Sequence, residues 1–333
     1  MEGEIGISCK WLAAVVLLLT FSARAQNLFE ADGRGGTIIE FTPGGTKSTY
    51  ASGFGYPWGL AFDRADNLFV VDWNGYIYEF NTNGVRSTFA SGLYEPAGLA
   101  IDRTGNLFVG TENGYIFEFT PGGTESIFAS GLGGVEGLAF DSSGNLFAAA
   151  GNIYKFTPGG TKSTFASGFG EPDALVFDPS GNLFVVCNTC TNITVIYTNG
   201  VVGEFGSGLD CPSAVAFDGA GNLFEADRCS GNICEFTFVT NSSSYGGQST
   251  FASGLVYPSG LAFQAVPALG AASTNGMFQL SVLMPSPYYS TIVQTSTNLV
   301  SWVSACTNTP PFTFTDSMMA AYPCRFYRAI VAQ

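Results

Sequence analysis

The sequence contains no histidine among its 333 residues. A Ser-His-Asp triad, a zinc site with imidazole ligands and a histidine general base are therefore excluded. The chemistry that remains available uses carboxylates, either as proton donors and acceptors or as ligands of a hard cation.

Charged residues are also scarce, at 11%, and most of them are acidic, since 12 Lys and Arg accompany 26 Asp and Glu. The net charge of −14 makes nucleic acid a poor partner, because phosphate binding needs a basic surface. The 43 glycines favour a compact β protein with many tight turns over a disordered acidic chain.

No window shows a sustained helical spacing of apolar residues, but one unit repeats along most of the chain. The tripeptide Asn-Leu-Phe recurs in steps of 40, 39, 39, 37 and 40 residues. It starts at Asn27, Asn67, Asn106, Asn145, Asn182 and Asn222. Each unit holds four short apolar runs separated by turn residues, as in GLAID, NLFVG, YIFEF and SIFAS. Four strands in about forty residues are typical of one blade of a β-propeller.

The two ends of the repeat complement each other. The first Asn-Leu-Phe has no innermost strand before it, and the last innermost strand, 260–263, has no Asn-Leu-Phe after it. We therefore predict an all-β fold with a six-bladed propeller of four-stranded blades over residues 26–263. Pairing of residues 259–263 with the strands of 27–52 should close the ring.

Two repeated positions have expected structural roles. The Leu and Phe of each Asn-Leu-Phe should pack between neighbouring blades. The Asp that ends each innermost strand should accept hydrogen bonds from the turn that follows it. These aspartates are Asp63, Asp102, Asp141, Asp178 and Asp218.

Two segments flank the predicted propeller. Residues 1–25 have the pattern of a secretory signal peptide, with Lys10 before the apolar run 11–21 and an Ala-x-Ala cleavage site that ends at Ala25. We expect secretion, to the periplasm or the exterior, and no membrane span in the mature chain, because the apolar run is too short for one. Residues 264–275 have the composition of a linker, and residues 276–333 alternate as in a small β-sandwich-like module.

Eight cysteines are present, and Cys9 belongs to the signal segment. The other seven are Cys187, Cys190, Cys211, Cys229, Cys234, Cys306 and Cys324. Disulfides persist in an exported protein, and the odd number leaves at least one cysteine free or intermolecular. Cys229 with Cys234 can close a predicted hairpin loop, and Cys306 with Cys324 can join two strands, which leaves the other three to compete for one bond. The single Cys-x-x-Cys spacing also allows a thiolate metal site.

The units, for example Tyr94-Glu-Pro-Ala-Gly-Leu-Ala-Ile-Asp followed by Gly105-Asn-Leu-Phe-Val, resemble NHL repeats. The stretch from about 27 to 263 resembles the propeller group of regucalcin, gluconolactonases and streptogramin lyases. This resemblance implies a fold that hosts binding proteins, lactonases and lyases alike. The lyases of the group depend on a histidine, which this chain lacks. The C-terminal pattern of 293–299, with Ser301-Trp and Arg325-Phe-Tyr-Arg, resembles a module of exported proteins from Verrucomicrobia-type bacteria.

The resemblance also implies a place for a metal ion. In regucalcin-like propellers, acidic or amide side chains five residues before the strand-ending Asp gather around a divalent cation on the axis. The matching positions here are Ser259, Trp58, Ala97, Glu136, Asp173 and Ser213. Only Glu136 and Asp173 agree in type, so they are the candidate ligands of a weak Ca²⁺ site.

The residues themselves point to the same ring of loops. Aromatic and carboxylate side chains are expected together on one face, where they suit a sugar, a cationic ligand or calcium. They are Tyr56, Trp58, Tyr94, Glu95, Glu136, Glu171 and Asp173, with the loops at Trp73-Asn74 and Glu112-Asn113. The simpler alternative is that they are solvated loop residues.

Three functions fit these observations. A secreted binding or scaffold propeller, with an extracellular polysaccharide, a small ligand or a protein as its partner, agrees best because no catalytic constellation is complete. A metal-dependent hydrolase of the lactonase kind is supported by Glu136 and Asp173. A structural component of the cell surface agrees with regular Ser/Thr-rich outer strands, such as 87–91 and 163–167.

Overall fold

A computed structural model of the chain describes residues 26–239 and 244–264, together with the backbone of six strands beyond residue 264. The expected signal segment, 1–25, lies outside the described residues. Contacts between Cα atoms make Gln26–Gln264 one compact unit, and the later strands belong to a second unit.

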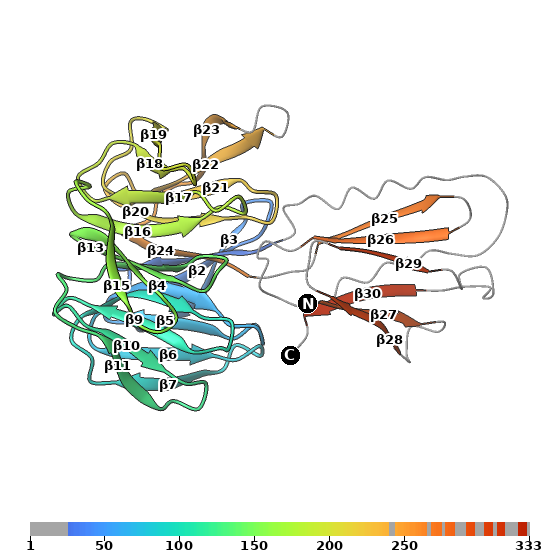
Figure 1. Cartoon of the computed structure of the whole chain (residues 1–333), viewed down its shortest axis with the longest axis horizontal. Helices are drawn as coiled ribbons and strands as arrows, with labels where there is room; N and C mark the ends of the chain where they lie inside the picture. Colours follow the sequence, from blue (N-terminus) through green and yellow to red (C-terminus); the bar gives the residue numbers. More distant parts are fainter. Residues whose placement is uncertain are drawn as a thin grey trace. The chain divides into compact units, whose positions relative to one another are not determined.

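The first unit consists of six four-stranded antiparallel sheets, visible as stacked blades in Figure 1. Blade 1 contains β24 (Pro258–Phe263), β1 (Leu28–Asp32), β2 (Thr37–Phe41) and β3 (Lys47–Ser52). Blade 2 contains β4 (Pro57–Phe62), β5 (Leu68–Asp72), β6 (Tyr76–Phe80) and β7 (Arg86–Ser91). Blade 3 contains β8 (Pro96–Ile101), β9 (Leu107–Thr111), β10 (Ile116–Phe119) and β11 (Glu125–Ala129). Blade 4 contains β12 (Gly137–Phe140), β13 (Leu146–Ala150), β14 (Asn152–Phe156) and β15 (Lys162–Ala166). Blade 5 contains β16 (Pro172–Phe177), β17 (Leu183–Cys187), β18 (Ile193–Ile196) and β19 (Val202–Phe205). Blade 6 contains β20 (Pro212–Phe217), β21 (Leu223–Asp227), β22 (Asn232–Val239) and β23 (Ser244–Ala252).

The predicted closure of the ring is confirmed. β24 pairs with β1, with Leu28 opposite Phe263 and Glu30 opposite Leu261. The innermost strands β24, β4, β8, β12, β16 and β20 then contact one another around the ring. Both ends of the propeller therefore contribute to the same blade, which leaves no unpaired blade.

The predicted role of the strand-ending aspartates is also confirmed. Asp63 accepts hydrogen bonds from the backbone N and the Nδ2 of Asn67, both at 2.8 Å. The same double contact recurs in the turns of the next four blades, at Asp102, Asp141, Asp178 and Asp218. The Asn of each Asn-Leu-Phe is thus part of the turn, while its Leu and Phe begin the core.

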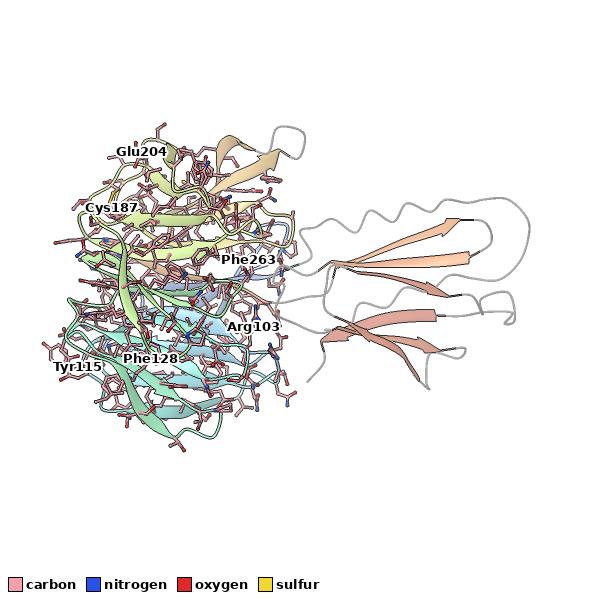
Figure 2. All side chains as sticks on the ribbon, viewed as in Figure 1. Arg103, Tyr115, Phe128, Cys187, Glu204 and Phe263 are labelled. Carbon is pink, nitrogen blue, oxygen red and sulfur yellow. A yellow bond between two sulfur atoms is a disulfide. The ribbon has the colours of Figure 1, made fainter. Side chains whose placement is uncertain are left out.

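The core lies between the blades, where side chains fill the spaces between neighbouring sheets (Figure 2). Leu28 packs towards blade 6 and Phe29 towards blade 2. Phe29 meets Tyr50 and Phe62 edge to face, each with ring centres 5.0 Å apart. Burial of such side chains contributes roughly 1.5–3 kcal/mol each. The predicted interblade packing of the Asn-Leu-Phe residues is therefore confirmed.

Small residues let the innermost strands approach closely near the axis. A Cβ on Gly260 would lie 2.0 Å from the carbonyl oxygen of Trp58, and one on Gly59 would lie 2.5 Å from that of Ala97. No larger residue fits these positions, because real Cβ contacts are not that short.

The second unit is described by backbone alone. Its strands form two three-stranded antiparallel sheets, in the orders β25-β26-β29 and β28-β27-β30. They are β25 (Ala268–Thr274), β26 (Met277–Leu283), β27 (Thr291–Ser296), β28 (Val303–Asn308), β29 (Phe312–Asp316) and β30 (Phe326–Val331). β25 occupies most of the stretch that we expected to be a linker.

The described cysteines pair differently from the expectation. Cys187 is bonded to Cys190, and Cys211 to Cys229. Cys234 is free and buried. The predicted Cys229–Cys234 bond is wrong, because Cys234 packs into the core between blades 5 and 6 while Cys229 stands in an exposed loop.

Two further expectations concern the remaining cysteines and the membrane. The Cys-x-x-Cys sulfurs are bonded to each other and are not thiolate ligands. Cys324 lies outside the described residues, so its bond to Cys306 stays a prediction. Among the described residues no helix is long and apolar enough to cross a membrane.

Candidate functional site

Two positions of the repeat place side chains at the same end of the propeller. The position leading into the innermost strand holds Ser259, Trp58, Ala97, Glu136, Asp173 and Ser213 in blades 1 to 6. The position directly after the second strand holds Gly33, Trp73, Glu112, Gly151, Asn188 and Arg228. In five blades, the backbone N of the second position donates to a carbonyl just before the first, as Trp73 does to Tyr56 at 2.9 Å. We call this end the axial face.

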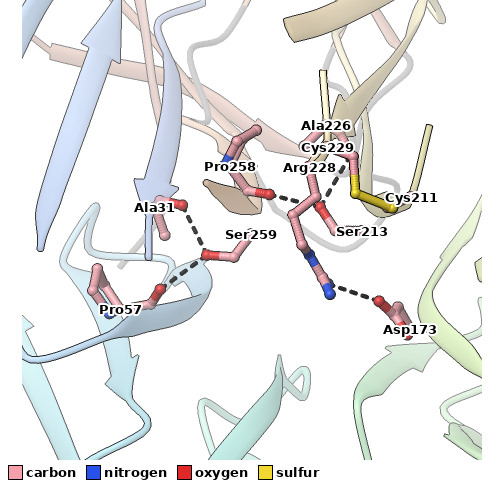
Figure 3. Close-up of polar contacts among 10 residues, drawn as sticks. All are labelled: Ala31, Pro57, Asp173, Cys211, Ser213, Ala226, Arg228, Cys229, Pro258 and Ser259. Atoms are coloured by element: carbon pink, nitrogen blue, oxygen red, sulfur yellow. Dashed lines mark hydrogen bonds and ion pairs between the residues drawn. A yellow bond between two sulfur atoms is a disulfide. The ribbon is translucent and has the colours of Figure 1, made fainter. Parts of the chain in front are cut away.

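An ion pair occupies the middle of the axial face. Arg228 Nη2 of blade 6 lies 2.7 Å from Asp173 Oδ2 of blade 5, and the two side chains are 6% and 7% exposed (Figure 3). Burial raises the pKa of Asp173 to about 6, although the Arg228 guanidinium acts in the opposite direction. Both charged groups are buried away from water, so their mutual attraction has to offset the free-energy cost of desolvation.

The guanidinium of Arg228 also contacts aromatic rings that belong to the next two blades of the ring. Its Cζ lies 4.7 Å from the centre of the Trp58 ring in blade 2 and 5.2 Å from that of Tyr257, which precedes blade 1. A side chain of blade 6 that contacts blades 1, 2 and 5 must lie close to the axis. Arg228 therefore joins the two halves of the axial face.

Four aromatic side chains form a cluster beside Arg228. Tyr56 stacks on Trp58 with centres 5.7 Å apart, and Trp73 lies 5.1 Å from Trp58. Tyr257 meets Tyr56 at 5.7 Å, and their hydrogen bond adds to burial in raising the pKa of Tyr56 to about 12. Trp58 is buried, whereas the other three are half-buried and keep part of their rings accessible. On the outer side, the exposed Arg34 lies over Tyr257 at 4.3 Å.

Aspartates at the ends of the second strands anchor the loops that carry these rings. Asp72 accepts hydrogen bonds from the backbone N of Gly55 and of Tyr56. Asp32 likewise accepts hydrogen bonds from the backbone N of Val256 and of Tyr257. In blade 6, Asp227 accepts a bond from Asp210 N at 2.9 Å. These repeated contacts hold the loops because a buried carboxylate binds several amides at once.

The disulfide Cys211–Cys229 reinforces the anchor next to Arg228. It connects the loop before β20 to the loop after β21, across 18 residues of sequence. The backbone N of Arg228 donates to the carbonyl of Cys211 between them. The position of Arg228 is thus fixed by a covalent bond, a backbone hydrogen bond and an ion pair.

Two further carboxyl groups meet between blades 3 and 4. Burial, a hydrogen bond with Glu112 and the charges of Glu112 and Asp173 raise the pKa of Glu136 to about 9. Glu136 therefore carries a proton at neutral pH and shares it with Glu112. A neutral carboxyl group both donates and accepts hydrogen bonds.

Three buried polar atoms of the axial face have no hydrogen-bond partner among the described residues, apart from the proton that Glu136 shares with Glu112. They are Arg228 Nε, Glu136 Oε2 and Glu112 Oε1. Such atoms are rare in folded proteins, because leaving one unsatisfied costs about 1–3 kcal/mol. Their presence at one end of the axis marks a place where a ligand or water would supply the missing bonds.

The two serines of the inner ring have a structural role instead. Ser213 Oγ lies 3.0 Å from the carbonyl oxygen of Ala226 and 2.8 Å from that of Pro258 (Figure 3). Both neighbours are acceptors, so the hydroxyl group donates its one proton between them. Ser259 Oγ contacts the carbonyls of Ala31 and Pro57 at 2.8 and 2.9 Å. Each serine bridges two neighbouring blades and is not available to a ligand.

The structure brings most of the expected residues to one place. Tyr56, Trp58, Glu136 and Asp173 belong to the cluster around Arg228, and the charge of Glu171 acts on Asp173. Tyr94 and Glu95 are not brought into this cluster in the same way. Tyr94 is 56% exposed, and neither residue affects the pKa of Glu136 or Asp173.

Sequence reasoning missed Arg228, although a signal was present. The loops at Trp73 and Glu112 were expected on this face, and Arg228 is the residue at the same repeat position in blade 6. Tyr257 was missed for a related reason, because it belongs to the loop that the ring closure brings to blade 1.

The candidate calcium ligands Glu136 and Asp173 lie near each other, since the charge of Asp173 acts on Glu136. Arg228 already balances the charge of Asp173, and Glu136 holds a proton at neutral pH. A cation would have to displace the Arg228 guanidinium from Asp173 and the proton from Glu136. This arrangement therefore supports only weak cation binding.

Comparisons with known proteins agree on the fold. The sequence matches no protein-family model and no curated protein. Among solved structures, a streptogramin B lyase superimposes with a TM-score of 0.57 and 11% identity, covering 100% of this chain and 98% of the lyase. A candidate gluconolactonase gives 0.55 and 13%, covering 91% of this chain and 97% of its own.

A third similar structure is an auxiliary nutrient binding protein from Bacteroides thetaiotaomicron. It superimposes with a TM-score of 0.51 and 14% identity, covering 78% of this chain and 76% of that protein. The superpositions show a similar fold, and at identities this low the fold alone does not specify an activity.

Proposed function

We propose that this protein is a secreted binding propeller that holds a polysaccharide, or another hydroxyl-rich ligand, on its axial face. The observation that carries the proposal is the group of unpartnered polar atoms on Arg228, Glu112 and Glu136, beside accessible aromatic rings. The two disulfides and the signal-like pattern of residues 1–25 support a place outside the cytoplasm.

The chemistry of the face suits hydroxyl groups. A sugar hydroxyl both donates and accepts a hydrogen bond, and so does the protonated Glu136. The free Nε of Arg228 offers a further donor. The half-buried rings of Tyr56 and Trp73 provide apolar surfaces on which the CH face of a sugar ring can pack. Orientation would come from the polar atoms and contact area from the aromatics.

The charge distribution favours a ligand without a strong charge. Arg228 neutralises Asp173, and Glu136 is protonated at neutral pH, so neither of these two carboxyl groups adds net charge to the face. A nucleophile or a general base for hydrolysis must be ionised and free to move a proton. Asp173 is held by Arg228 instead. Binding therefore agrees with this arrangement better than hydrolysis does.

Similar folds serve binding in other proteins, as the description of the auxiliary nutrient binding protein states. The partners that we propose are extracellular polysaccharides, with small ligands or proteins as the outcomes of a wider screen.

Thermal melting of the full-length protein with a panel of soluble plant and bacterial polysaccharides tests the proposal. A glycan that binds the folded form raises the melting midpoint. We expect Trp73→Ala to abolish that rise. Tyr197→Ala is the matched control, because Tyr197 is 43% exposed and belongs to the turn between β18 and β19, at the opposite end of the blade. An equal rise in both variants would refute binding at the axial face.

A further inference from the structure

A second group of polar side chains lies away from the axial face, inside blade 6. Glu225 of β21 stands directly opposite Cys234 of β22. Asp227 follows two residues after Glu225 and so points to the same face of the sheet. One carboxylate oxygen from each acid and the Cys234 sulfur all lie within 4.8 Å of one another. In Figure 1, β21 and β22 belong to the blade whose outermost strand is β23.

Glu225 is the unexplained member of this group. Its side chain is 0% exposed, and its carboxyl group has no hydrogen-bond partner among the described residues apart from the Cys234 thiol. An acid buried in this way costs free energy unless further groups satisfy it. One of its oxygens lies within 4.8 Å of an Asp227 oxygen and of the Cys234 sulfur, and both of these residues are buried as well. The side chain is therefore aimed at a place where a cation would satisfy it.

Blade 1 contains the same strand sequence without the thiol. β1 and β21 both read Leu-Phe-Glu-Ala-Asp, with Glu30 in the place of Glu225 and Asp32 in that of Asp227. The residue opposite Glu30 is Ile39, whereas Cys234 stands opposite Glu225. The cysteine is therefore the feature that distinguishes the two blades, and Glu30 offers a matched internal control.

We propose that Glu225, Asp227 and Cys234 bind a divalent transition-metal cation of the zinc type. Thiolate sulfur is a ligand that zinc accepts readily and that calcium and magnesium avoid. One thiolate and two carboxylates repel one another when they are buried together without a cation. A doubly charged ion between them offsets that repulsion. Asp227 contributes an oxygen while it keeps its bond from Asp210 N, because each carboxylate oxygen has two lone pairs.

A side chain of the outermost strand contacts the thiol. The exposed Gln248 of β23 places its Nε2 3.8 Å from Cys234 Sγ. A water or the amide oxygen of Gln248, once rotated, would complete four-coordination around the ion.

Titration of the chelator-treated, full-length protein with Zn²⁺ and, separately, with Co²⁺ tests the site. We expect one equivalent of Zn²⁺ to bind and Co²⁺ to give the absorption band of a thiolate-to-cobalt bond. Cys234→Ser should remove the band, and Glu225→Gln should weaken Zn²⁺ binding at least tenfold. Glu30→Gln should leave both readouts unchanged.

Other cysteines need a control, because Cys306 and Cys324 also follow the propeller in the sequence. A Cys306→Ser/Cys324→Ser variant should retain the cobalt band. The proposal is overturned if the band survives in Cys234→Ser, if Glu30→Gln weakens binding as much as Glu225→Gln, or if the unaltered protein binds no Zn²⁺. Cys234→Ala replaces Cys234→Ser if the serine variant does not fold. These outcomes are independent of glycan binding at the axial face.

Discussion

Arg228 extends from blade 6 to Asp173 of blade 5, and its Nη2 lies 2.7 Å from the Asp173 Oδ2 with both side chains buried. The same guanidinium lies over Trp58 of blade 2. One side chain therefore connects distant blades at the axis, and it sets both the stability and the chemistry of the axial face.

Loss of either partner of this ion pair should destabilise the fold strongly. Arg228→Gln leaves the buried Asp173 carboxylate uncompensated, so we expect the free energy of unfolding to fall by about 3–5 kcal/mol. Urea denaturation followed by circular dichroism measures the change. The control is Arg34→Gln, which alters an exposed arginine and should stay within about 0.5 kcal/mol. Equal effects of the two substitutions would contradict the role of the pair.

Ligand binding should depend on the proton of Glu136. Its pKa of about 9 keeps it protonated at neutral pH, so affinity for a bound glycan should stay constant up to about pH 8 and decline as pH rises through 9. Glu136→Gln, which resembles the protonated form, should bind at neutral pH and lose this decline. Affinity measured by calorimetry across that range checks the prediction, and an unchanged decline in the variant would assign it to another group.

The free energy of unfolding should fall as pH rises above the ordinary pKa of a glutamate carboxyl group. Burial, aided by the charge of Asp32, raises the pKa of Glu30 well above its ordinary value. The unfolded chain releases this proton at lower pH than the folded protein does, so the stability conferred is full below about pH 4.5 and declines as pH rises towards the folded pKa.

Glu30→Gln should therefore reduce the decline of the melting midpoint between pH 5 and 8, roughly the range in which the unfolded carboxyl group is ionised. The exposed Glu125 of β11 provides the control, because Glu125→Gln is the same substitution without a change to a buried group. The account fails for Glu30 if both variants keep the slope of the unaltered protein.

The two disulfides should differ in what they stabilise. Replacement of Cys211 and Cys229 by alanine opens a loop of 18 residues and should cost about 3 kcal/mol, together with a loss of glycan affinity through Arg228. Replacement of Cys187 and Cys190 opens a separation of only 3 residues, should cost about 2 kcal/mol, and should leave affinity unchanged. Denaturant titration and calorimetry of the two variants distinguish these outcomes.

The effect of calcium on thermal stability should depend on the charge of Arg228. Glu136 and Asp173 remain our candidate ligands, and Arg228 opposes a cation beside them. We expect a small effect of millimolar Ca²⁺ on the melting midpoint of the unaltered protein and a larger one in Arg228→Gln. Additional Glu136→Gln and Asp173→Asn substitutions should remove the effect. A calcium effect that persists in their presence would place the ion elsewhere.

The parts of the structure that follow from local sequence were predictable. Asp63 and Asn67 form their turn within five residues, and the apolar alternation after Asn67 sets which side chains enter the core. Ring closure was predictable too, because the two incomplete ends complement each other. The disulfide between Cys211 and Cys229 was not, since it depends on how loops from two strands of one blade approach each other.

The candidate site was predictable only in part, and for a physical reason. The repeat register places Glu136, Asp173 and Trp58 on one face, but it does not tell how far a long side chain extends. Arg228 contacts Asp173 because its loop is held by Cys229 and because the carboxylate attracts it. The proton on Glu136 depends likewise on the burial and the neighbours of that side chain in the folded protein.

The central claim is that ligand binds at the axial face, and tryptophan fluorescence tests it most directly. Trp58 and Trp73 are the only tryptophans between residues 26 and 264, and both belong to this face. Trp302→Phe removes the tryptophan that follows the propeller, and in a chain without residues 1–25 it leaves these two as the reporters. The account predicts a saturable change in emission when a glycan that raises the melting midpoint is added. Saturable binding of that glycan by calorimetry, with no change in emission, would contradict it.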